Sequence, residues 1–140
     1  MKSFKPYSAS VLAFAGLLLV GMGIYFVFIR TALLPEDVRY MQTTSSIIKQ
    51  TIPQLSGWLQ KVFWVMGSYI LTTGLLIIFI SLTSFRKRIS GAFGIIAVTG
   101  ISSIGSMTVV NFMISSDFKW LLLTFTLPWA IALILYRFNK

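Results

Sequence analysis

The side chains that ordinarily carry out chemistry are few in this 140-residue sequence. The chain has no histidine and no cysteine, so it lacks the commonest general base, the commonest metal-binding nitrogen and any thiolate nucleophile. Its three acidic residues are Glu36, Asp37 and Asp117. Adjacent carboxylates on a helix point about 100° apart, a poor geometry for chelating one metal ion or for facing each other across a substrate. These three are the only carboxylate side chains available for acid–base catalysis or metal binding. We therefore expect no catalytic residues, no metal site and no cofactor.

The composition excludes a soluble globular domain. Apolar and aromatic residues make up 56% of the chain, only 11% of residues are charged, and the mean hydropathy is +0.86. Soluble domains ordinarily have about 25% charged residues, so this chain has too few to solvate its surface. The high apolar content also excludes a disordered tail, and the absence of cysteine excludes a small secreted disulfide protein.

Charged residues divide the chain into four long stretches that contain none: 6–29, 62–85, 89–116 and 120–136. A helix needs about 20 apolar residues to cross a bilayer. Backbone amides in lipid must be paired internally, and continuous apolar runs such as residues 75–80 favour helices over barrel strands. The sequence predicts an all-α fold, a four-helix transmembrane bundle in a single domain over 1–140, with spans at about 8–29, 60–84, 89–114 and 119–137.

The first stretch has a second interpretation, as a cleaved signal peptide that begins with two lysines. Its apolar run is longer than the usual signal-peptide core, and no small-x-small cleavage site follows it. We therefore expect it to remain as a membrane span.

The distribution of basic residues predicts the orientation. The N-terminus, the turn after the second span and the C-terminus together carry seven of the 12 basic residues and no acidic residue. Basic residues near span ends stay in the cytoplasm, so both termini are expected there and residues 31–60 outside. The basic run from Arg86 to Arg88 is interpreted as a topology anchor that also attracts anionic lipid. The net charge of +9 is explained in this way and does not indicate nucleic-acid binding.

The long first outer loop carries signs of a short amphipathic helix over about residues 35–52. Pro35 suits a first helical turn, and Glu36 and Asp37 follow where negative charge stabilises the helix N-terminus. Apolar residues recur at helical spacing, which predicts a helix lying in the outer membrane interface. Pro53 is expected to end it.

Two interpretations remain for Glu36, Asp37 and Arg39. The first is helix capping together with a local surface ion pair. The second is an outer-face contact site for a cation, a lipid head group or a partner protein.

Small and polar residues within the spans suggest how the helices pack. Residues 90–106 are rich in Gly, Ala, Ser and Thr, so we expect this helix to pack closely along most of its length. Smaller stripes include Gly16 and Gly23 in the first span and Gly67 and Gly74 in the second. Packing within one bundle is the simpler interpretation, and homodimerisation or docking to a larger partner is the alternative.

A polar pocket in the outer half of the bundle is a further hypothesis. Asn111 is expected to hydrogen-bond to another helix or to interfacial water, with a substrate role as the alternative. We expect Trp129 to pack between helices. The residues that would line the pocket are Tyr69, Thr72, Ser103, Ser106 and Asn111.

The segment from Leu33 to Met41 reads Leu-Leu-Pro-Glu-Asp-Val-Arg-Tyr-Met. It resembles a segment in the first outer loop of small bacterial inner-membrane proteins of uncharacterised activity with four predicted spans. The resemblance covers this motif and the arrangement of the spans. It implies a bacterial cytoplasmic membrane and no particular activity.

Two classes of function remain. The first is a non-catalytic multi-pass membrane protein, an accessory, assembly or lipid-interacting subunit, favoured because the charge-free stretches hold no ionisable group of the kind that carriers use. The second is a carrier or channel for a small neutral or lipophilic solute. The expected partners are the lipid bilayer, a second copy of the chain or a larger membrane protein.

Overall fold

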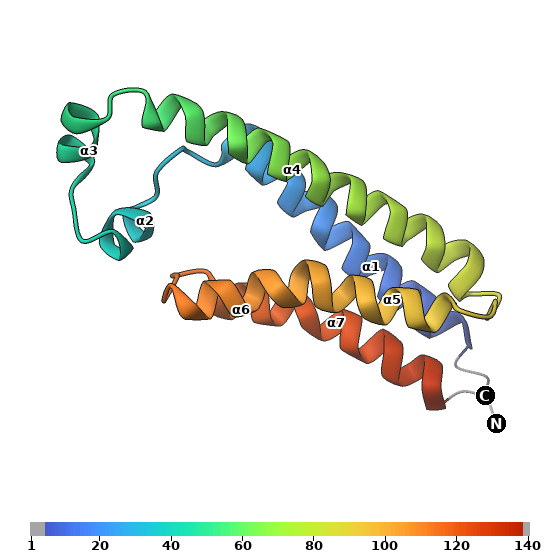
Figure 1. Ribbon diagram of the computed structural model, residues 1–140. Helices are drawn as coiled ribbons and strands as arrows, with labels where there is room; N and C mark the ends of the chain where they lie inside the picture. The colour runs from blue at the N-terminus through green and yellow to red at the C-terminus, as the bar shows by residue number, and fades with distance from the viewer. Residues whose placement is uncertain (1–4, 139–140) are drawn as a thin grey trace.

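The computed structural model describes residues 5–138, and this part of the chain is helical with connecting turns and no strand. Four helices are long and apolar enough to cross a membrane (Figure 1): Tyr7–Ile29, Leu55–Phe85, Ala92–Met113 and Lys119–Phe138. The predicted all-α four-helix bundle is confirmed, and the chain has the architecture of a multi-pass membrane protein.

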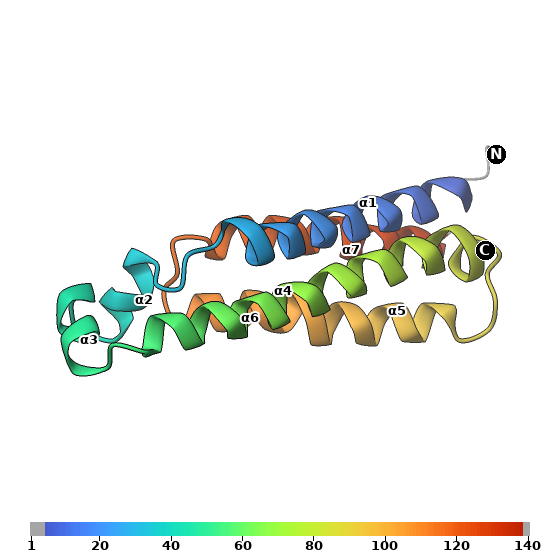
Figure 2. The ribbon, with the colours of Figure 1, turned by 90° about the horizontal axis from the view of Figure 1, so that it is seen from above.

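Three of the four spans contain a π-helical segment. The first span is α1 (Lys5–Ile24) and η1 (Tyr25–Ile29), the second α4 (Leu55–Ile80) and η2 (Ser81–Phe85), the third α5 (Ala92–Gly100), η3 (Ile101–Gly105) and α6 (Ser106–Met113), and the fourth α7 (Lys119–Phe138). Figures 1 and 2 show two short helices at one end of the bundle, which we call the loop end. The opposite end holds the α4–α5 turn and is called the turn end.

The closest helix pair in the bundle is α1 with α4. A Cβ atom at Gly23 would lie 2.5 Å from the Leu71 backbone nitrogen, and one at Gly74 would lie 2.7 Å from the Gly16 backbone oxygen. Hydrophobic burial does not drive helices together in lipid, so such close backbone approach supplies the dispersion contacts. Gly16, Gly23, Gly67 and Gly74 therefore serve packing within one bundle, as the simpler interpretation predicted.

The expectation that the third span packs closely along most of its length was wrong. The first span is the most enclosed: 39% of the residues in its apolar stretch are buried, compared with 22% in the third span. A Cβ at Gly94 would meet nothing within 4 Å, and the Ser102 and Ser106 hydroxyls donate to carbonyls of their own helix. These small residues need no neighbouring helix, so their abundance does not determine how closely the span packs.

The outer loop contains two helices where the sequence suggested one over residues 35–52. They are α2 (Pro35–Tyr40) and α3 (Ser45–Thr51). Gln42 adopts a positive φ of 53°, and the Thr44 hydroxyl accepts a hydrogen bond from the Ile47 amide and so caps α3. Side chains of the Thr type compete with helical hydrogen bonding and favour such caps. The break separates the predicted apolar stripe into two short faces.

The bundle is open on one side. Helix α1 packs against both α4 and α7, and α7 packs against α5 and α6, whereas α4 has few direct contacts with α5 or α6. Trp129 of α7 fills the space beside α5, where its indole Nε1 donates to the Ile96 carbonyl at 2.9 Å. Trp129 thus packs between helices, as predicted. The bundle consists of two helix pairs, α1 with α4 and α7 with α5 and α6, and these pairs separate towards the loop end (Figure 1).

Candidate functional site: an intramembrane cleft bridged by α2

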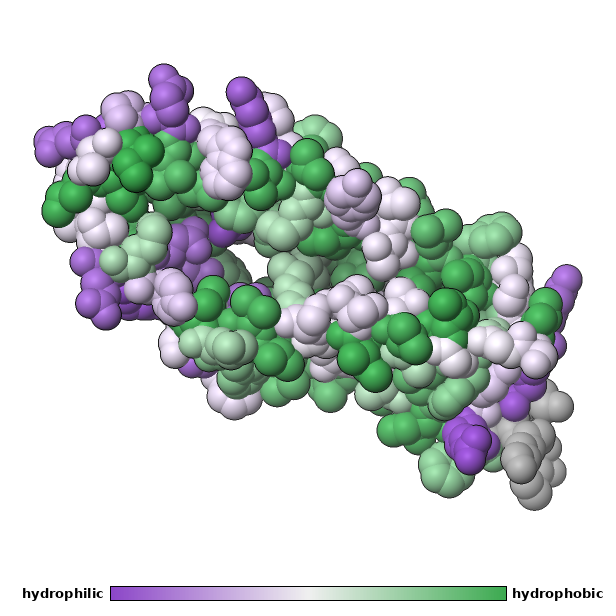
Figure 3. Space-filling view, viewed as in Figure 1, coloured by the Kyte–Doolittle hydropathy of each residue, from purple (hydrophilic) through white to green (hydrophobic). Residues whose placement is uncertain are grey.

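The separated helix pairs enclose a cavity of about 1290 Å³ in the half of the bundle near the loop end. It extends from α1 and α4 on one side to η3, α6 and α7 on the other, and Figure 3 shows its opening between α4 and α6. Sites for small ligands usually measure about 300–1,000 Å³, so this cavity is large enough for a long-chain molecule. We call it the cleft.

The wall of the cleft is mainly apolar. Leucine, methionine and phenylalanine side chains such as Leu18, Met22 and Phe125 form most of it. The polar side chains that line it are largely engaged within their own helices: Ser103 donates to the Thr99 carbonyl and Ser106 to the Ser102 carbonyl. These hydroxyl protons are therefore already used, and the wall offers little hydrogen-bonding capacity to a polar ligand.

Four of the five residues proposed for a polar pocket line the cleft: Tyr69, Ser103, Ser106 and Asn111. Thr72 does not, and its hydroxyl donates to the Ser68 carbonyl of the same helix. The Asn111 amide donates to the Met107 carbonyl at 2.9 Å, where we had expected a bond to another helix or to water. The structure thus brings these positions together, but in a space whose character is apolar.

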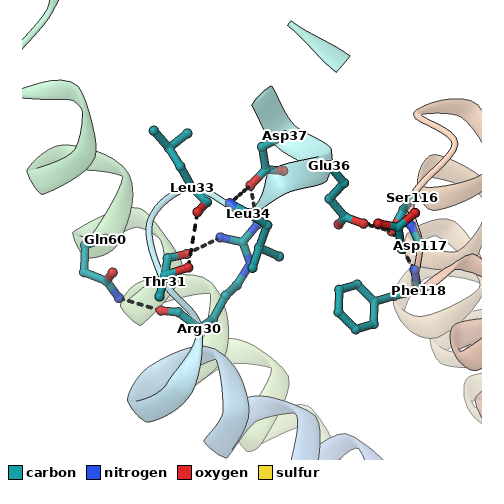
Figure 4. Close-up of polar contacts among 10 residues, drawn as sticks. All are labelled: Arg30, Thr31, Leu33, Leu34, Glu36, Asp37, Gln60, Ser116, Asp117 and Phe118. Carbon is teal, nitrogen blue, oxygen red and sulfur yellow. Dashed lines mark hydrogen bonds and ion pairs between the residues drawn. The ribbon is translucent and has the colours of Figure 1, made fainter. Parts of the chain in front are cut away.

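Helix α2 lies across the loop end of the cleft, and its first contact is with the α1–α4 pair (Figure 4). Arg30 follows η1 directly, and its Nη2 donates to the Asp37 carboxylate at 3.2 Å. The guanidinium stacks 3.4 Å from the centroid of the Phe63 ring on α4. Asp37 also accepts from the Leu34 amide at 2.8 Å and so caps α2, as the first of the two interpretations predicted. The side chain of Arg30 is only 8% exposed, so this contact is largely shielded from water.

The second contact of α2 is with the turn between α6 and α7. Glu36 is 7% exposed, and its Oε2 accepts from the Ser116 hydroxyl at 2.9 Å and from the Asp117 amide at 2.7 Å. Hydrogen bonds to a charged group are worth about 1.5–3 kcal/mol each when shielded. One turn of α2 therefore connects the two helix pairs, and the Phe118 ring points from the α6–α7 turn towards the space beneath it (Figure 4).

A third contact is exposed. Arg39 pairs with Asp117 at 2.8 Å, and the two side chains are 58% and 63% exposed. Such pairs contribute at most about 1 kcal/mol. The partner is distant in sequence, so the local surface ion pair expected for Arg39 is replaced by a contact between elements. We name the three contacts together the α2 bridge: Arg30–Asp37, Glu36 with Ser116 and Asp117, and Arg39–Asp117.

Sequence reasoning missed Arg30, Ser116 and Asp117 as part of this region. In the sequence, Arg30 is simply the charged residue that follows the first charge-free stretch. Its position seven residues before Asp37 is a signal that could have suggested the ion pair. Nothing local marks Ser116, because its contact with Glu36 spans 80 residues of sequence.

Replacing Glu36 with alanine is expected to separate α2 from the α6–α7 turn, because both hydrogen bonds to Oε2 are lost. The chain has no cysteine, so spin labels at Y40C and M113C, which replace two exposed residues, report the distance across the bridge without background labelling. We expect a narrow distance distribution in the parent chain and a broad, longer one in the Glu36→Ala variant, measured by pulsed electron resonance.

Ser116→Ala is the matched control for this prediction, because it removes one of the same two donors. The double variant should be no broader than Glu36→Ala alone, since the two changes act on a shared contact. An unchanged narrow distribution in Glu36→Ala would show that α2 is held by something else.

In comparisons with known proteins, no family model, no curated protein and no solved structure matches this chain.

Proposed function

We propose that this protein is a lipid-interacting membrane protein that admits the hydrocarbon part of a lipid into the cleft through the opening between α4 and α6. The observation that carries the proposal is the character of the cleft: a large space, lined mainly by apolar side chains, whose serine and threonine hydroxyl groups are already bonded to their own helices. Such a wall favours alkyl chains and gives a polar solute little to replace its hydration.

Charges at the loop end support an amphiphilic occupant. Lys61 and Arg30 reach the cleft near the start of α4 and the end of η1, near the depth of lipid head groups. Lys61 is exposed and has no ion pair among residues 5–138, whereas Arg30 is held by Asp37. Lys61 is thus placed to attract an anionic head group while the alkyl chain lies between the helices.

We also propose that the loop end faces the outside of a bacterial cytoplasmic membrane. The charge asymmetry between the two ends supports this orientation, and the resemblance of the Leu33–Met41 segment supports the compartment. Reporter fusions at the two termini test it: both are expected to be active in the cytoplasm, and opposite locations would refute the orientation.

Replacing a small residue that lines the cleft with a large one is expected to exclude the lipid. Val110 lines the cleft on α6, and its neighbour Val109 does not, although the two are similarly exposed at 52% and 59%. Val110→Trp fills part of the space and is expected to reduce labelling by a photoactivatable diacyl phospholipid at least tenfold in reconstituted vesicles. Val109→Trp is the matched control and should label as the parent does.

Mapping the labelled peptides decides what occupies the cleft. Labels on cleft-lining positions such as Met66 and Met107 support the proposal. Labels spread evenly around the bundle would mean that lipid only surrounds the protein. A crosslink across the cleft to a second copy, or to another membrane protein, would favour an assembly subunit instead.

A carrier for a lipophilic solute is a second candidate, and the α2 bridge is the observation that favours it. A carrier needs an element that opens and closes its site, and α2 connects the two helix pairs through only a few contacts. If this function holds, transfer of a fluorescent lipophilic probe between leaflets should be faster in Glu36→Ala than in the parent. Equal rates would leave lipid binding as the function.

A further inference from the structure

The α4–α5 turn contains a guanidinium group that the chain itself does not satisfy. Arg88 lies in the turn after η2 with a positive φ of 56°, and its guanidinium carbon lies 4.5 Å from the centroid of the Tyr136 ring on α7. Its Nη2 is enclosed and has no hydrogen-bond partner among the described residues. No other buried side-chain nitrogen or oxygen in residues 5–138 lacks a hydrogen-bond partner.

No acidic side chain can reach Arg88. The sequence has three, Glu36, Asp37 and Asp117, and all lie at the loop end with partners of their own. The charged side chains near Arg88 are instead Arg86, Lys87 and, on α7, Arg137 beside Tyr136. An enclosed cation without a counter-charge is costly, so an anion from outside the chain would stabilise this end.

The position and shape of Arg88 indicate which anion fits. The turn directly follows the span that ends at Phe85, so it lies at head-group depth, where the available anions are lipid phosphates. Tyr136 covers one face of the guanidinium and is itself held by Phe85, at 4.4 Å, and Phe93, at 5.6 Å between ring centroids. The in-plane N–H groups remain for a phosphate, which guanidinium binds through two parallel hydrogen bonds.

We propose that Arg88, stacked on Tyr136, binds the phosphate of an anionic phospholipid at the turn end, with Arg86, Lys87 and Arg137 adding attraction around it. The site is separate from the cleft and does not depend on its occupant. Arg88 as a residue is only partly buried, and binding requires a rotation about its side-chain bonds that turns Nη2 towards the interface.

The backbone conformation at Arg88 allows a glycine substitution that preserves the turn. A residue other than glycine costs roughly 1–2 kcal/mol in the left-handed conformation. Arg88→Gly is therefore suited to this backbone and removes the guanidinium. Arg88→Lys keeps the charge but cannot form the paired, planar hydrogen bonds.

The experiment is native mass spectrometry of the full chain released from vesicles of phosphatidylcholine and phosphatidylglycerol. We expect one phosphatidylglycerol to be retained, with affinity at least tenfold weaker in Arg88→Gly and at least fivefold weaker in Arg88→Lys. Arg86→Gln and Lys87→Gln are matched controls on the same turn, and each should weaken retention less than about fivefold, which corresponds to ~1 kcal/mol for one interfacial charge. Unfolding midpoints of all variants verify that the fold is kept.

Two outcomes would overturn the proposal. Equal losses in Arg88→Gly, Arg86→Gln and Lys87→Gln, with no loss in the charge-conserving Arg88→Lys, would mean that the lipid responds to diffuse positive charge and not to the guanidinium of Arg88. Displacement of phosphatidylglycerol by inorganic phosphate, added at a concentration that leaves the ionic strength matched, would assign the site to free phosphate.

Discussion

Gly23→Ala is expected to destabilise the bundle by about 1–3 kcal/mol, the usual cost of overpacking. The added Cβ would lie 2.5 Å from the Leu71 nitrogen, 2.7 Å from its Cα and 2.8 Å from the Gly67 oxygen. These are backbone atoms, so no side-chain rotation relieves the contact and α1 must move away from α4. Unfolding of the purified protein in mixed micelles, followed by circular dichroism, measures the effect.

Gly21→Ala is the matched control, because Gly21 lies on the same helix and a Cβ there meets nothing within 4 Å. This variant should be as stable as the parent. Equal stability of Gly23→Ala would mean that α1 and α4 are not held at the distance the structure gives, and the second glycine contact, Gly16 with Gly74, would then need the same test.

Replacing Arg30 with alanine is expected to have the second large effect, a loss of about 1.5–3 kcal/mol for a shielded, charged hydrogen bond. Asp37 loses its ion pair, and the Phe63 ring loses the guanidinium stacked on it at 3.4 Å. Helix α2 is then held mainly by Glu36 and Arg39. Hydrogen–deuterium exchange of the α2 amides should become much faster.

The exposed ion pair of Arg39 with Asp117 provides the control for Arg30. Arg39→Ala removes an arginine from the same short segment, but both partners are more than half exposed, so the loss should stay below about 1 kcal/mol. Arg30→Lys keeps the charge and loses the planar stacking, so its exchange rate should lie between those of the parent and Arg30→Ala. Identical exchange in Arg30→Ala and Arg39→Ala would contradict the importance of the shielded contact.

The two large effects concern different parts of one arrangement. The glycine contacts bring α1 and α4 together along their length, and Arg30 connects the end of that pair to α2. The cleft exists because the other pair, α6 with α7, has no comparable close approach to α4. Loosening either contact is therefore expected to change the width of the cleft as well as stability.

The four spans could be predicted from the amino-acid sequence alone, because crossing a bilayer depends mainly on the length and apolar character of each segment. Helix capping by the acidic residues at the start of α2 was one of the two interpretations that the sequence left open, because a cap is formed by residues close together in the chain, and Asp37 is the residue that forms it. The glycine stripes of the first two spans were visible for a similar reason: close helix approach needs small residues at helical spacing.

Which surfaces meet could not be predicted from the sequence and depends on the tertiary fold. The small residues of the third span pointed to close packing, yet their hydroxyls bond to their own helix, and no local signal selects a neighbour for them. Glu36 could be placed at a helix start, but its partners Ser116 and Asp117 lie some 80 residues away and are chosen by how the two helix pairs separate. The apolar character of the cleft could not be predicted for the same reason. The serine side chains that line it look polar in the sequence, but their hydroxyl groups are hydrogen-bonded to carbonyls of their own helix.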